Sequence, residues 1–64
     1  MIVIHFSENE RNKNGVVIKQ SGNQWKAEEY RNATETIYER VLDDGQLAQL
    51  LRFCEQRGAI VENR

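Results

Sequence analysis

The chain has 64 residues, of which 39% are hydrophobic and 30% charged, and its formal net charge is −1 at pH 7. This balance lacks the basic excess typical of proteins that bind bulk nucleic acid or anionic membranes. The length predicts one domain, residues 1–64, with a small core, because a chain of this size buries only about 60% of the surface that it exposes when unfolded.

The only cysteine is Cys54, so an internal disulfide is excluded and a reducing, cytoplasmic setting is favoured. No apolar run has the length of a signal-peptide core or of a transmembrane helix. We therefore expect a cytoplasmic protein that does not bind membranes.

Alternating apolar residues predict a strand at the start of the chain, with Ile2, Ile4 and Phe6 on one face. Residues 8–14 are polar and form a connection. The dipeptide Asn14–Gly15 is typical of a tight turn and is expected to lead into the next strand.

Residues 16–20 are rich in β-branched side chains and predict a second strand. A turn at 21–23 separates it from a third strand over 24–30. Because the connections are short, these three strands should form an antiparallel meander.

Residues 32–42 fit two structures. Asn32 and Glu35 have the spacing of a capping box, which would start a helix. The segment is nevertheless rich in threonine, tyrosine and β-branched residues, which favour strands. We favour a fourth strand over 36–42, and a helix remains the alternative.

The segment 43–58 predicts an amphipathic helix with both ends marked. Asp43 can cap the first amides with Gln46 as its capping-box partner, and Gly58 suits a left-handed C-terminal cap. Helical spacing places four residues on one apolar stripe: Leu47, Leu50, Leu51 and Cys54. Residues 59–61 fit a short last strand or a tail packed on the helix end.

Together these elements predict an α+β fold, with an antiparallel sheet of four to five strands and one C-terminal amphipathic helix packed on one face. The helix stripe should cover a core on that face. Its expected strand residues are Ile2, Ile4, Phe6, Val16, Ile18, Trp25, Ala27 and one side of the fourth strand.

Catalytic and cofactor chemistry finds little support in the sequence. His5 is the only histidine, and we expect it half-exposed on the uncovered face of the sheet rather than in a catalytic pair. One histidine and one cysteine cannot supply the four ligands of structural zinc. Phosphate-binding glycine loops and nucleophile motifs are missing. We therefore expect no enzymatic activity, no metal and no cofactor.

The sheet face that the helix leaves uncovered is the predicted binding surface. By alternation it should carry Val3, His5, Val17, Lys19, Lys26, Glu28 and Tyr30, plus either Tyr38 and Arg40 or their alternates. Phe53 lies off the helix stripe and could add a contact. An ordinary solvated sheet face would have a similar composition. The candidate protein-binding residues are Val17, Lys19, Lys26, Tyr30, Tyr38 and Phe53.

These features suggest a small protein-binding module, such as an inhibitor, adaptor or regulatory accessory protein of the kind frequent in phages and mobile elements. It would act through the uncovered sheet face or an edge strand, on another protein or as a homodimer. The alternative is a nucleic-acid-associated regulator that uses cations of the first hairpins. Its candidate contacts are Arg11, Lys13, Lys19 and Lys26.

Overall fold

A computed structural model describes residues 1–33 and 35–64. Within these residues the chain forms five strands, one α-helix and one 3-10 turn. In chain order they are β1 (Ile2–His5), η1 (Glu8–Glu10), β2 (Gly15–Ser21), β3 (Gln24–Arg31), β4 (Glu35–Leu42), α1 (Asp44–Gln56) and β5 (Ile60–Asn63).

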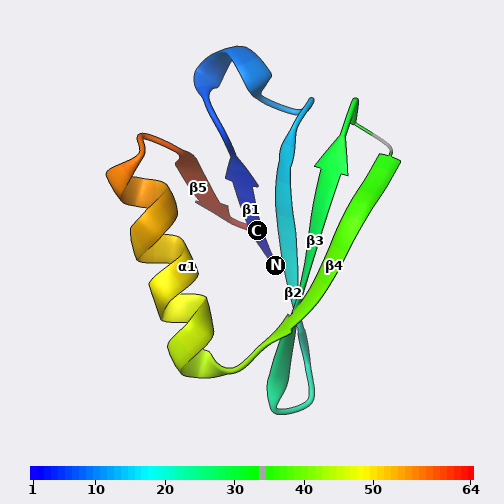
Figure 1. Ribbon diagram of the computed structural model, residues 1–64, viewed down its shortest axis with the longest axis vertical. Helices are drawn as coiled ribbons and strands as arrows, with labels where there is room; N and C mark the ends of the chain where they lie inside the picture. Colours follow the sequence, from blue (N-terminus) through cyan, green and yellow to red (C-terminus); the bar gives the residue numbers. More distant parts are fainter. Residues whose placement is uncertain (34) are drawn as a thin grey trace.

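The strands form one antiparallel sheet in the order β4-β3-β2-β1-β5. Figure 1 shows α1 beside β5 at one side of the sheet and β4 at the other side. The predicted α+β class, with one helix against an antiparallel sheet, is confirmed. The strand interpretation of 36–42 is also confirmed, and the helix alternative for that segment is wrong. Residues 60–63 form a last strand that pairs with β1, so the alternative of a tail packed on the helix end is wrong.

Both predicted ends of α1 are confirmed. The Asp43 carboxylate accepts the Gln46 backbone N–H at 2.8 Å, and the Gln46 side-chain oxygen accepts the Asp43 backbone N–H at 3.0 Å. At the other end Gly58 has φ +80, a left-handed conformation that suits glycine. The Gly58 N–H donates to Glu55 O at 3.1 Å and the Ala59 N–H to Cys54 O at 3.0 Å, which completes a Schellman cap.

The core lies between α1 and the sheet. Its buried members are Ile4, Val16, Ile18, Ala27, Leu42, Leu47 and Cys54. Ile2, Trp25, Leu50 and Leu51 pack around them and are partly buried. The Trp25 indole N–H also donates to the Asp44 carboxylate at 2.9 Å, which ties β3 to the start of α1. The placement of Phe6 in the core is wrong: β1 ends at His5, the chain leaves the sheet there, and Phe6 is 37% exposed.

Gly15 lies in a strand of the sheet and not in a turn. The predicted turn at Asn14–Gly15 is wrong, because Gly15 is the first residue of β2 and pairs with His5. A Cβ atom at Gly15 would lie 2.0 Å from the Ile4 carbonyl oxygen and 3.0 Å from the Tyr30 hydroxyl. Only glycine leaves room for this approach of the neighbouring backbone.

Two glycine substitutions should therefore change stability in opposite directions. Gly15→Ala forces an overlap with the Ile4 backbone, so we expect a loss of roughly 1–3 kcal/mol or more. Gly45→Ala meets nothing closer than 3.4 Å in the first turn of α1, and reduced freedom of the unfolded chain should add about 0.4–1 kcal/mol. Urea unfolding followed by circular dichroism measures both. Equal effects of the two changes would contradict the assigned role of Gly15.

Candidate functional site

The register of the strands places seven predicted residues on the sheet face opposite α1. Val3 pairs with Val17, which pairs with Glu28. His5, Gly15 and Tyr30 form a second row, and Lys19 with Lys26 a third. The alternate residues of the same strands belong to the core under α1. The sequence prediction of which face Val17, Lys19, Lys26 and Tyr30 occupy is therefore confirmed, whereas their binding role stays a prediction.

This face carries an open cavity with a volume of about 430 Å³. We call it the open-face groove. Val3 and Val17 supply its apolar part, and Tyr30 lies beside them. Polar and charged side chains complete its lining, among them Lys19, Glu28 and Arg64. An apolar centre within a polar rim is the usual anatomy of a protein contact surface.

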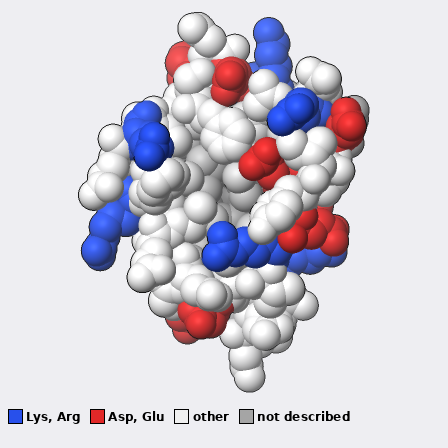
Figure 2. Space-filling view, in the orientation of Figure 1, with Lys and Arg blue, Asp and Glu red and all other residues white. Residues whose placement is uncertain are grey.

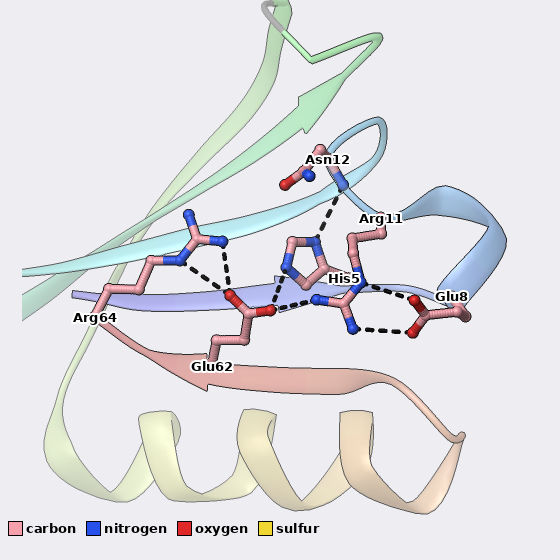
Figure 3. A network of polar contacts seen from close by, with 6 residues as sticks. All are labelled: His5, Glu8, Arg11, Asn12, Glu62 and Arg64. Atoms are coloured by element: carbon pink, nitrogen blue, oxygen red, sulfur yellow. Dashed lines mark hydrogen bonds and ion pairs between the residues drawn. The ribbon is translucent and has the colours of Figure 1, made fainter.

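A polar network covers one end of the same face. His5 is fully buried, so the prediction that it is half-exposed is wrong. The connection between β1 and β2 folds over it, and the Asn12 backbone N–H donates to His5 Nδ1 at 3.3 Å. Nε2 lies 3.3 Å from a Glu62 carboxylate oxygen, in a poorly aligned contact (Figure 3). A neutral ring with its proton on Nε2 fits both neighbours. No substrate can reach this ring, which supports a structural role.

Glu62 holds this network together (Figure 3). Its carboxylate accepts from Arg64 Nε at 3.0 Å and Nη2 at 2.6 Å, and from Arg11 Nη1. Arg11 also makes a two-pronged contact with Glu8, with both N···O distances 2.9 Å. These bonds, first that from Arg64 and then that from Arg11, hold the pKa of the Glu62 carboxyl below its usual range. The network thereby fixes the β1–β2 connection against β5.

Two of the four cations of the nucleic-acid alternative are engaged by carboxylates. Arg11 is engaged by Glu8 and Glu62. The Lys26 ammonium lies 3.3 Å from Glu28 and 3.3 Å from Glu39, contacts that raise the pKa of Lys26. Lys13 and Lys19 form no ion pair with any described residue, and Lys19 lies opposite Lys26. Because phosphate binding depends on unpaired cations, the pairing of Arg11 and Lys26 weakens the alternative, which stays a prediction.

Two of the six candidate binding residues lie elsewhere. Tyr38 pairs with Glu29 on the α1 side of the sheet, where it lines a 150 Å³ cavity beside Leu50, so its placement on the uncovered face is wrong. The cause is the register of β4: Tyr38, Arg40 and Leu42 alternate regularly, and Leu42 lies in the core on the α1 side. A bulge follows beyond Tyr38, where Tyr30 pairs with Thr36 and Ile37 is left unpaired. Figure 2 shows this side of the molecule, hollowed between the helix and β4.

Phe53 is 51% exposed on the outer surface of α1, under the Arg57 guanidinium at 4.3 Å from the ring centroid. It therefore lies outside the open-face groove. Cys54, on the same helix, is buried, and burial raises the pKa of its thiol, as expected for a core residue.

Over residues 1–33 and 35–64, no three His, Cys, Asp or Glu side chains come together as a metal-binding group. No helix in this part of the chain is both long and apolar enough to cross a membrane. Comparisons with protein-family models, with curated proteins and with solved structures found no match. The function must therefore be argued from the geometry.

The lowered pKa of Glu62 predicts a pH dependence of stability. Ionised Glu62 stabilises the fold fully above its usual value of 4.5, and this contribution is lost as the pH falls through the lowered folded-state value. Arg64→Ala removes the leading donor, so it should lower the urea midpoint at neutral pH and reduce the loss of stability on acidification. Urea titrations at several pH values measure both effects.

Arg52→Ala is the matched control, since Arg52 is exposed on α1 and forms no ion pair with any residue in the described ranges. If Arg64→Ala and Arg52→Ala give the same pH profile, the network does not contribute to stability.

Proposed function

We propose that this chain is a small non-enzymatic protein-binding module whose contact surface is the open-face groove. One observation carries the proposal: the partly exposed Val17 and Tyr30 lie together, beside the buried Val3, on a sheet face that the only α-helix of the described residues does not cover. Aliphatic and tyrosine side chains within a charged rim are typical of the centres of protein interfaces.

The groove is supported from behind and from one side, which favours binding without rearrangement. Val3 is 3% exposed and belongs to β1, the strand held between β2 and β5. Tyr30 has its hydroxyl close to Gly15, where no side chain intervenes. Rigid side chains lose little conformational entropy when a partner docks, so more of the contact free energy remains as affinity.

The chemistry of the groove is better suited to recognition than to catalysis. The histidine on this face is sealed beneath the β1–β2 connection, and Lys26 and Glu28 are paired with each other. Inhibitor, adaptor and regulatory accessory roles are all compatible with such a surface. The single buried thiol suits a reducing, cytoplasmic setting.

A capture experiment tests the groove. Tagged parent protein and two variants, Val17→Lys and Phe53→Ser, are each incubated with nuclease-treated lysate of the source cells, and bound proteins are identified by mass spectrometry. Val17→Lys places a charge within the groove and should reduce capture of a stoichiometric partner at least tenfold, because burying an unpaired charge in an interface is costly. Phe53→Ser changes an exposed apolar residue outside the groove and should retain the partner.

Circular dichroism shows whether both variants remain folded. Equal loss of the partner in both folded variants would place the contact outside the groove. Capture of nucleic acid alone in untreated lysate, abolished by nuclease, would overturn the protein-binding proposal.

A further inference from the structure

We propose that the free edge of β4 binds an extended segment of a protein partner by antiparallel strand addition. The segment carries an apolar, an acidic, a basic and an apolar residue in that order. This inference rests on the proposed function only in that the partner is a protein, and it adds a second contact next to the open-face groove.

The two edges of the sheet differ in length and exposure (Figure 1). β5 has four residues, three of which are partly buried. β4 has eight residues, and all except Leu42 are exposed. Its outer side offers backbone donors and acceptors that no other strand of the sheet uses. A long exposed edge of this kind is a template for pairing with another chain.

Apolar side chains are exposed along both faces of this edge. Tyr38 and Val41 are each 57% exposed, and Ile37 is 38% exposed. Tyr38 lies on the α1 side, whereas Val41 lies on the open face opposite Lys26. A strand added at this edge would cover both side chains at once, in addition to forming backbone hydrogen bonds.

A second copy of this chain fits the edge poorly in the registers centred on its two adjacent charges. Residues that oppose each other directly in an antiparallel pair point to the same face. Two β4 strands paired around a two-fold axis at Glu39 or at Arg40 therefore place that charge opposite its own copy, whereas an axis at Tyr38 places Tyr38 opposite Tyr38 and Arg40 opposite Thr36. Like charges in direct opposition destabilise a strand pair. The charges of β4 thus disfavour the two self-pairing registers centred on Glu39 and Arg40, and an edge partner of opposite charge order gains contacts that a second copy in any of these registers lacks.

The same two charges favour a partner strand that places an acidic residue opposite Arg40 and a basic residue opposite Glu39. Arg40 forms no ion pair with any side chain that the structure describes, so an acidic residue opposite it gains a contact. The Glu39 contact with Lys26 uses Oε1, which leaves Oε2 for a basic residue on the added strand. Val41 and Tyr38 on either side favour apolar neighbours. Read in the antiparallel direction, from Val41 to Tyr38, the complementary segment is apolar, acidic, basic, apolar.

Peptide binding to the full chain tests the proposal. The probe is a capped octapeptide with valine, glutamate, lysine and tyrosine at its centre, followed by amide chemical shifts in NMR. The control has the same composition with glutamate and lysine exchanged. We expect shifts along residues 35–42 and about tenfold or more weaker binding of the control, since two attractive pairs become repulsive. The double variant Glu39→Lys with Arg40→Glu should prefer the control peptide.

N-methylation of the peptide tests the backbone contact without altering the protein. In a strand pair only alternate amides face the neighbouring strand. Methylating one alternate set should abolish binding and methylating the other set should leave it nearly unchanged. Similar losses for both sets would overturn strand addition.

Three other outcomes would also overturn the inference. They are an absence of binding by the probe, peptide shifts confined to the open-face groove, and concentration-dependent self-association that shifts the amides of residues 35–42. The last result would make a second copy the occupant. None of these outcomes decides the proposed function, which is tested separately by the Val17→Lys capture experiment.

Discussion

The pairing of β5 with β1 is the constraint on which the rest of the structure depends. It joins Ile4 to Val61 and Val3 to Glu62, and so places the last strand beside the first. β4 and β5 then lie at opposite edges, and the chain between them must cross the sheet as α1. Leu47 and Cys54 reach the core in this way. With one crossing helix, one face of the sheet is covered and the other is left open.

The same pairing determines how much of the open face is available. Glu62 lies next to His5 on the sheet face opposite α1. Its carboxylate therefore accepts hydrogen bonds from Arg11 and Arg64 on that face (Figure 3). The β1–β2 connection is thereby held over the β1 end of the face. The remaining surface runs from Val17 toward β4. The network thus acts as a boundary of the groove, and the groove and the β4 edge are adjacent parts of one surface.

Local signals in the sequence were sufficient for the elements themselves. Asp43, Gln46 and Gly58 mark both ends of α1, because capping depends on residues within one turn. Strand alternation likewise placed Val17 and Tyr30 on one face. The errors arise where distant segments meet. Burial of His5 needs a connection that is anchored by Glu62, some fifty positions later in the chain. The side taken by Tyr38 depends on the register of β4 against β3, in which Leu42 pairs with Trp25 and enters the core.

The adjacent Glu39 and Arg40 bear on which strand can pair with the exposed edge of β4. Natural edge strands are usually shortened, bulged or charged against unwanted pairing. β4 carries a bulge at Ile37 and then two opposite charges in sequence. A run of one charge would repel every strand of the same sign and attract all strands of the other. Glu39 followed by Arg40 instead repels a second β4 strand that is paired with its centre at either residue. The same two charges attract a strand that places an acidic residue opposite Arg40 and a basic residue opposite Glu39. The pair therefore selects a partner by sequence order, while Tyr38 and Val41 provide the apolar contact.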